Sequence, residues 1–228
     1  MVSKNLYQLG SLKEPKLMSR DIYERLRDTI IDGKLRGRDR IVESELAKTW
    51  GVSRQPIREA LGMLETDGFI ELIPHRGAVV TDITAKEVRE NLQIKAMVEG
   101  YASWVDAKRF GKKDIADLEL ILENMERDIE QEDVQGILNG NFEFHRKLVD
   151  GVANEKISRY YDSLTQFLRR FYTISLTKKY NWNPSLFEHR QVLDFIKSKN
   201  AEAAEAATRQ HAFNSIDRAL RQLELVGE

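Results

Sequence analysis

The sequence predicts a mainly α-helical protein of two domains, and three observations carry that prediction. The composition is that of an ordinary folded chain, with 41% hydrophobic residues, 32% charged residues and only four prolines in 228 residues. Glycines and a proline separate short elements before residue 82, whereas long amphipathic stretches follow it. Thr84, followed three residues later by Glu87, is a capping-box pattern that begins the second part. We therefore expect an N-terminal arm over residues 1–14 and domains over 15–82 and 83–228.

The first domain is expected to contain three helices followed by a β-hairpin. The predicted helices cover 18–32, 43–50 and 53 to about 67. Gly51 and Val52 supply a sharp turn between the second and third helices, and Ser53 can cap the third. Two short β segments, 70–73 and 78–80, are joined by Pro74-His75-Arg76-Gly77. Helix, helix–turn–helix and hairpin in this order are the layout of a winged helix.

The second domain is expected to be an antiparallel bundle, because six helical patterns follow one another with no strand between them. They cover about 84–110, 114–129, 133–151, a stretch that starts after Asn154, 184–199 and 201–225. Gly111 is expected to stop the first of them and Asn200 to cap the last, while 178–183 is expected to be a loop.

Composition also excludes several classes of protein. The chain has no cysteine, which removes disulfides, cysteine-based zinc fingers, iron–sulfur clusters and thiol nucleophiles. No apolar run approaches the roughly 18 residues of a membrane span, and the N-terminus has no apolar core of a signal peptide. We therefore expect a cytoplasmic protein that does not enter the membrane. The net charge of −1 argues against a uniformly basic nucleic-acid-coating protein.

The third predicted helix has the polarity of a DNA-recognition helix. Its first turn offers Ser53, Arg54, Gln55 and Arg58 to phosphates or base edges. Pro56 lacks an N–H, but this costs little within the first turn of a helix. Its later turns bury apolar residues. Seven Lys or Arg against three Asp or Glu give residues 34–58 a local charge of +4, which is a focused basic patch.

Three of the four histidines fall in the bundle, each on a different predicted helix: His145, His189 and His211. Asn141 precedes His145 by one helical turn and shares its face. Three imidazoles and an oxygen donor would suit a borderline divalent ion such as Zn²⁺, Ni²⁺ or Mn²⁺. On spacing alone, histidines that are merely hydrogen-bonded in the core or at the surface remain the alternative.

The segments ESELAKTWGVSRQPIREAL (43–61) and DGFIELIPHRGAVV (67–80) resemble the DNA-binding domain of the GntR family of bacterial transcription regulators. The resemblance implies that Arg54 and Arg58 contact operator DNA together with the residues around them, Ser53, Gln55 and Pro56. It also implies that the wing tip, His75-Arg76-Gly77, reaches the minor groove. Ser44 departs from the pattern, because many relatives carry an arginine there that makes a further base contact.

Residues 84–228 resemble the FadR-type C-terminal domain, the FCD domain, which is a ligand-binding bundle of six or seven helices. The resemblance implies metal ligands at Asn141, His145, His189 and His211, with Asn141 standing where most relatives have aspartate. It also implies that Lys95, where relatives carry an arginine four residues before a glutamate, holds a carboxylate effector. Asn154 and Arg169 are further candidates for the effector site.

These expectations combine into a homodimeric transcriptional regulator, not an enzyme. It would act as a repressor on double-stranded operator DNA, under the control of a small organic-acid or sugar-acid effector bound with a divalent metal ion. Two alternatives remain open from the residues: a metal-dependent hydrolase that uses the three histidines, and a winged-helix module that binds proteins.

Overall fold

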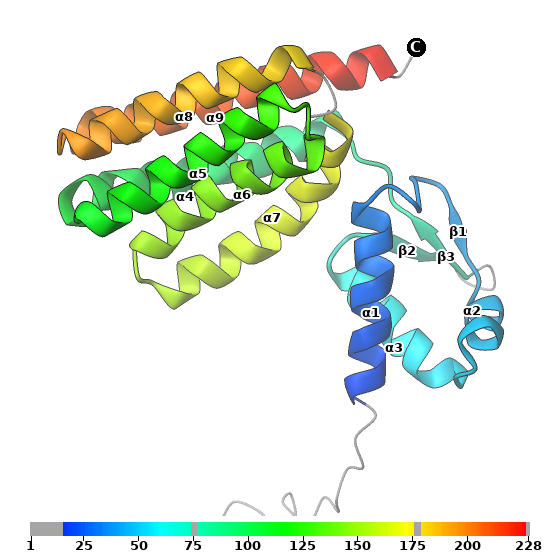
Figure 1. Cartoon of the computed structure of the whole chain (residues 1–228). Helices are drawn as coiled ribbons and strands as arrows, with labels where there is room; N and C mark the ends of the chain where they lie inside the picture. Colours follow the sequence, from blue (N-terminus) through cyan, green and yellow to red (C-terminus); the bar gives the residue numbers. More distant parts are fainter. Residues whose placement is uncertain (1–15, 74–76, 176–178, 227–228) are drawn as a thin grey trace, which may run out of the picture. The chain divides into compact units, whose positions relative to one another are not determined.

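The computed structural model describes residues 16–73, 77–175 and 179–226, and the chain divides into two compact units, Met1–Asp82 and Ile83–Glu228 (Figure 1). Each unit has its own cluster of buried apolar side chains. The fold is mainly helical, as the sequence predicts, with a small sheet in the first unit.

The first unit is a winged helix–turn–helix. Its elements are α1 (Lys16–Ile31), β1 (Arg40–Ile41), α2 (Glu43–Trp50), α3 (Arg54–Thr66), β2 (Ile70–Ile73) and β3 (Gly77–Val80). The sheet has the order β1-β3-β2 with both pairs antiparallel, so that Ile41 faces Ala78 and Ile70 faces Val80. Gly51 ends α2 in the left-handed conformation, as its place in the turn predicts.

Helix α3 is held by its apolar side. Ile57, Leu61 and Leu64 are fully buried and pack in one cluster with Ile30 of α1 and Ile70 of β2. This spacing of three and four residues keeps one face of the helix in the core and leaves the opposite face in solvent. The packing therefore orients the first turn of α3 outward.

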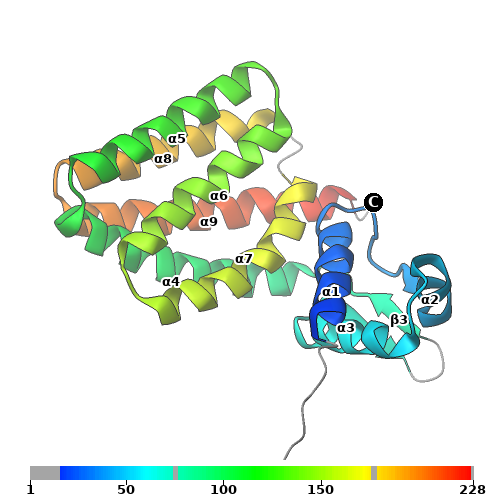
Figure 2. The ribbon, with the colours of Figure 1, turned by 60° about the horizontal axis from the view of Figure 1, so that its bottom comes forward.

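The second unit is a bundle of six helices in the described part of the chain (Figures 1 and 2). These are α4 (Ala85–Arg109), α5 (Lys112–Glu130), α6 (Val134–Gly151), α7 (Glu155–Ser175), α8 (Trp182–Lys197) and α9 (Ala201–Val226), with a short 3₁₀ helix, η2 (Lys179–Asn181), before α8. Helix α4 packs along α9, and α5 packs against α6 and α8. The core between them is built from leucine, valine, phenylalanine and alanine side chains.

Capping residues set several of these helix boundaries. The Thr84 hydroxyl accepts a hydrogen bond from the Glu87 N–H (3.2 Å), and the Glu87 carboxylate accepts one from the Thr84 N–H (3.0 Å), which confirms the predicted capping box. Asn200 Oδ1 accepts a hydrogen bond from the Ala203 N–H (3.2 Å) at the start of α9. The cap predicted for this last helix is therefore confirmed as well.

Some boundaries differ from the prediction. Strand β1 was not predicted, because two residues carry no alternating pattern and only pairing with β3 defines them. Helix α5 begins at Lys112, so Gly111 lies at its N-terminal boundary, and the Asp114 carboxylate accepts a hydrogen bond from the Gly111 N–H. Residues 179–183 are helical rather than a loop, since α8 starts at Trp182, whose indole is buried.

Candidate functional site

The first turn of α3 presents polar side chains to solvent. Ser53, Arg54 and Gln55 are exposed, whereas Ile57 on the opposite side is fully buried. Ser53 occupies the N-cap position but makes no side-chain capping bond, so its hydroxyl is not engaged there. The Gln55 amide donates to the Glu59 carboxylate across one helical turn at 3.0 Å. The arrangement offers guanidinium, amide and hydroxyl groups at the end of a helix, which suits phosphates and base edges.

Arg58 is a second exposed cation on α3, and it has a partner on α2. Its Nε donates to Glu43 Oε2 at 2.8 Å, and 60% of its side chain is accessible. Pro56, in contrast, is buried against the core of the unit. Pro56 therefore lies on the inner side of α3, and its predicted part in DNA binding stays a prediction.

At the wing, His75 and Arg76 lie outside the described residues. Gly77 is the first residue of β3 and has a φ of +85°, and a β-carbon there would lie 2.8 Å from the Ile41 carbonyl oxygen. Glycine is needed at this position because the backbone is left-handed and approaches β1 closely. The structure thus supplies a packing reason for Gly77.

In the second unit the three bundle histidines meet at one point. His145 on α6, His189 on α8 and His211 on α9 are almost wholly buried, and each pair of their Nε2 atoms is 3.2 Å apart. No cysteine or carboxylate belongs to this group among the described residues. Three helices that are far apart in the sequence therefore direct the same ring nitrogen to a common position.

Glu188 fixes the orientation of one ring. His211 Nδ1 lies 2.7 Å from Glu188 Oε2, so Nδ1 carries the hydrogen and Nε2 is left with its lone pair. Arg218 donates to both oxygens of the same carboxylate, at 2.9 and 2.7 Å, and Asn214 donates to Oε1 at 2.8 Å. Burial alone would raise the pKa of Glu188, but the bonds from Arg218 and His211 outweigh it and lower the pKa to about 2.

Glu99 of α4 stands behind a second ring. His145 Nδ1 lies 3.1 Å from Glu99 Oε2, and Lys95 Nζ donates to the same oxygen at 2.6 Å. The Tyr161 hydroxyl of α7 donates to the other oxygen. Although burial opposes it, the positive and polar groups around Glu99 hold the pKa of this carboxyl far below its usual value.

The three imidazoles are neutral at physiological pH. Burial lowers the pKa of His145 to about 4, against the opposing effect of Glu99, and burial likewise lowers the pKa of His189 and His211. Neutral imidazole is the form that binds metal ions. His189 Nδ1 is buried and has no hydrogen-bond partner among the described residues.

This donor set fits a divalent metal ion. Two nitrogens 3.2 Å apart, each about 2.1 Å from one ion, subtend an angle of roughly 100° there, between octahedral and tetrahedral values. A carboxylate behind a ligating imidazole is the usual support of such sites, and Glu188 and Glu99 both take that position. Asn141 is buried one helical turn before His145 on α6, consistent with its predicted place beside the cluster.

The three candidates for the effector site lie apart. Lys95 is buried against Glu99, directly behind His145, whereas Arg169 is exposed on α7 with its guanidinium 4.6 Å from the Phe142 ring centre. Asn154 caps α7, because its side-chain oxygen accepts hydrogen bonds from the N–H groups of Lys156 and Ile157. Fifteen residues of one helix place Asn154 about 22 Å from Arg169 along the axis, so the two cannot hold the same small molecule.

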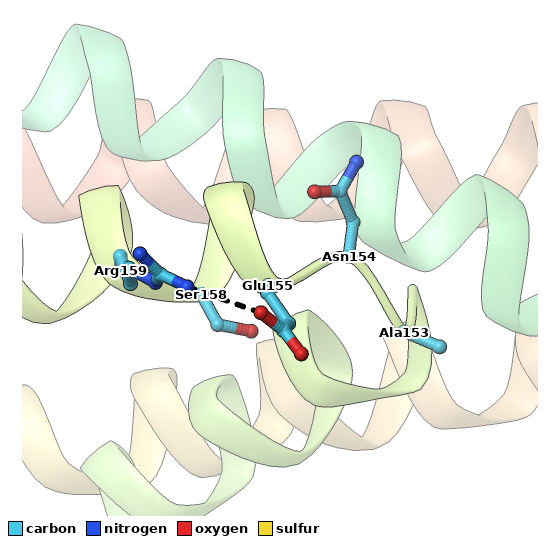
Figure 3. A pocket seen from close by; sticks show the side chains of 5 residues that line it. All are labelled: Ala153, Asn154, Glu155, Ser158 and Arg159. Carbon is cyan, nitrogen blue, oxygen red and sulfur yellow. Dashed lines mark hydrogen bonds and ion pairs between the residues drawn. The ribbon is translucent and has the colours of Figure 1, made fainter.

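Asn154 also lines a surface hollow at the start of α7 (Figure 3). The hollow is formed by Ala153, Asn154, Glu155, Ser158 and Arg159, and an ion pair of 3.1 Å joins Arg159 to Glu155 within it. None of the three histidines takes part. Asn154 therefore has a structural role as the cap of α7, and its part in effector binding stays a prediction.

The sequence did not reveal which groups support the histidines. No local sequence pattern marks Tyr161 or Arg218 as part of the site, although Arg218 donates a hydrogen bond to each oxygen of Glu188. The only local signal is the position of Glu188 directly before His189. Glu188 nevertheless contacts the imidazole of His211 and not that of His189. These contacts join side chains of α4, α7, α8 and α9, so a local sequence pattern cannot predict them.

Comparison with known proteins identifies both units. Residues 18–80 match the family model of bacterial regulatory proteins of the gntR family, and residues 90–214 match the FCD domain. The HTH-type transcriptional regulator YdhC of Bacillus subtilis is 31% identical over 88% of this chain and 90% of its own length. The gluconate operon transcriptional repressor of the same species is 28% identical over 86% of this chain and 82% of its own length.

Solved structures show the same fold. A GntR transcriptional regulator from Rhodococcus sp. RHA1 superposes with a TM-score of 0.73 at 22% identity, covering 89% of this chain and 97% of that one. McbR/YncC of Escherichia coli gives a TM-score of 0.72 at 18% identity, covering 90% and 98%. None of the helices in the described part of the chain combines the length and the hydropathy that a membrane span requires.

The relatives and the fold are those of transcriptional regulators and not of enzymes, and no observation favours a hydrolase. The chain belongs to the GntR family of bacterial transcriptional regulators, with an FCD domain as its second unit.

Proposed function

We propose that the protein is a dimeric repressor that binds operator DNA through α3 and responds to a small carboxylate bound with a divalent metal ion in the bundle. Membership of a DNA-binding family supports the first half, and the relative named as the gluconate operon repressor supports the sign of regulation. The observation that carries the second half is the convergence of three buried imidazoles on one point.

The DNA-binding surface is the exposed side of α3. Arg54 and Arg58 supply the charge, and Gln55 supplies an amide that can pair with a base edge. Glu43 holds the Arg58 side chain in place at 2.8 Å. Because the pair is exposed, it can open at little cost when a phosphate competes for the guanidinium.

The DNA half is tested by operator binding of Arg54→Ala and Arg58→Ala. Each should lose specific affinity by about tenfold or more, since a base-edge contact is worth about 1–3 kcal/mol. Glu43→Gln is the matched control, because it breaks the ion pair with Arg58 but keeps the guanidinium. If both arginine variants bound the operator as tightly as the parent protein, α3 would not be the reading element.

In the bundle, His145, His189 and His211 would hold the metal ion, with Asn141 as a further oxygen donor. When bound, the ion would act as a Lewis acid to which a carboxylate effector could bind. Glu188 orients His211, Glu99 Oε2 lies 3.1 Å from His145 Nδ1, and Lys95 neutralises Glu99. Among the effector candidates, Lys95 lies nearest the histidines, with only the Glu99 carboxylate between it and His145.

The metal half is tested by elemental analysis of protein purified without chelators, and by the shift in melting temperature on adding Zn²⁺, Ni²⁺ or Mn²⁺. One ion per chain and a stabilising shift are expected in the parent protein, and both should be lost in His189→Ala. His75→Ala is the control, because it removes a histidine that is not in the cluster. A parent protein with neither metal nor a shift would refute this half and leave the DNA half standing.

A further inference from the structure

Helix α4 has two apolar faces, although one is enough to anchor it in the bundle. Val88 and Leu92 on the inner face are fully buried. On the outer face, Ile94 is 51% exposed, Met97 62% and Tyr101 46%. Large apolar side chains gathered on one exposed surface usually mark a site of contact with another protein.

The outer face has the spacing of a coiled-coil seam. Ile94, Met97, Tyr101 and Trp104 follow one another at intervals of three, four and three residues. The rings of Tyr101 and Trp104 stack with their centres 6.4 Å apart. A seam of this spacing is complete only when a second helix lies along it.

Charges at the two ends of the seam indicate which helix that is. Continuing the same intervals, the seam passes through Glu90 at the N-terminal end and reaches Lys108 at the C-terminal end, where Lys108 Nζ lies 3.1 Å from the ring centre of Trp104. Both are exposed. Laid antiparallel on a second copy of α4, the seam matches itself: Glu90 faces Lys108, Ile94 faces Trp104 and Met97 faces Tyr101, each pair occurring twice.

A parallel arrangement would instead place Glu90 against Glu90 and Lys108 against Lys108, which is unfavourable at both ends. The self-matching of the antiparallel arrangement is what a two-fold symmetric interface requires, because the same surface serves both subunits. Charge complementarity therefore selects a second copy of this chain, in one direction.

Helix α9 extends this surface on one side. A β-carbon on Gly100 of α4 would lie 2.8 Å from the Arg209 side chain, so α9 borders the seam there. Phe213, one turn beyond Arg209 on the same side of α9, is 47% exposed. Its ring adds apolar area beside the seam.

We propose that the α4 seam, Glu90 to Lys108, is the surface on which two copies of the protein pair, with their α4 helices antiparallel. The proposal rests on the dimeric regulator proposed above and specifies where its subunits meet. It ties the FCD domains together at the helix whose inner face supplies Lys95 and Glu99 to the histidine cluster.

Site-specific cross-linking tests the direction of pairing, and the natural absence of cysteine makes it clean. Glu90→Cys and Lys108→Cys are each expressed alone and then co-expressed, and the full-length proteins are treated with a short bis-maleimide. Antiparallel pairing predicts a covalent dimer only in the co-expressed sample, because like positions lie about 27 Å apart along the helix axis. Cross-linking of either variant with itself, or of none, would overturn the proposal.

Sedimentation equilibrium of full-length variants tests the surface itself. Met97→Glu should raise the dimer dissociation constant by about a hundredfold or more, since the substitution enters the centre of the interface twice. Leu120→Glu on α5 is the matched control, an equally exposed apolar position at 55% that should not change dimerisation. Circular dichroism checks that both variants remain folded.

Charge reversal supplies a second variant set at solvent-exposed positions. Glu90→Lys and Lys108→Glu should each weaken the dimer, and the double variant should restore it, because both cross-subunit pairs are then re-formed. A dimer insensitive to all of these changes would overturn the α4 seam while leaving the dimeric regulator intact. A parent protein that stays monomeric at every concentration would refute the dimer itself.

Discussion

Two carboxyl groups on α4, seven residues apart, are both fully buried and yet lie in opposite environments. The two oxygens of Glu99 accept hydrogen bonds from Lys95 and Tyr161, and His145 Nδ1 lies 3.1 Å from one of them. Asp106 has no hydrogen-bond partner for either oxygen among the described residues. The pKa of Glu99 is accordingly lowered far below its usual value, whereas burial and the neighbouring Asp114 raise the pKa of Asp106 to about 8.

The surroundings of Asp106 show how such a group is accommodated. A β-carbon on Gly151 of α6 would lie 2.3 Å from Asp106 Oδ1 and 2.3 Å from the Phe110 ring, so glycine leaves just enough room for the acid. A neutral carboxylic acid costs far less to bury than a carboxylate. Burial therefore does not fix the charge of a side chain; the groups brought to it do, and α4 carries one example of each outcome.

We expect the largest loss of stability when the Glu99 carboxylate, the partner of Lys95, is removed. Glu99→Ala leaves the Lys95 ammonium buried without its carboxylate, and we expect the free energy of unfolding to fall by about 3–5 kcal/mol. Urea unfolding of metal-free protein measures it. The double variant Lys95→Met/Glu99→Leu should recover most of the loss, because no charge remains buried; additive losses would show that the two side chains do not act as a pair.

A smaller effect is expected at Asp106 and depends on pH. With a pKa of about 8 in the folded protein and about 3.9 in the unfolded chain, Asp106 binds more protons when folded. Its contribution to stability is complete below pH 3.9 and is lost as the pH rises towards 8, at up to about 1.4 kcal/mol per pH unit. The Asp106→Asn variant lacks this titrating carboxyl group, so its stability does not depend on pH through this position.

The measurement is the difference in unfolding free energy between Asp106→Asn and the parent protein at pH 5 and pH 7. This difference should shift in favour of the variant by about 2–3 kcal/mol between the two values, because only the parent protein loses stability through this group. The titrating histidines affect both proteins alike and cancel. A difference that does not change with pH would show that Asp106 is ionised in the fold.

A still smaller change is expected in metal affinity, through the support that Glu99 gives to His145. Glu99→Gln keeps the size of the side chain but removes the charge behind His145 Nδ1, and we expect metal affinity to fall by about 10- to 100-fold. Isothermal titration with Zn²⁺ measures it. Glu126→Gln on α5 serves as the control, since that glutamate pairs at the surface with Arg190; an equal loss in both would exclude a specific role for Glu99.

Much of the fold could be predicted because its signals are local. Gly51 marks the turn of the helix–turn–helix, and Thr84 and Glu87 mark the start of the bundle within four residues of sequence. The α4 seam shows the limit of such signals. Ile94 and Leu92 are equally apolar in the sequence, and only packing against α9 and the other helices decides which of them is buried.

The candidate site divides in the same way. Helical periodicity in the sequence is enough to predict that three histidines lie on the bundle helices and that the first turn of α3 is polar, because it assigns residues to faces. The tertiary structure alone decided that the three Nε2 atoms converge, that Pro56 is buried and that Asn154 caps a helix. It also decided the protonation of Glu99 and Asp106, since a pKa depends on groups that folding brings together from distant parts of the chain.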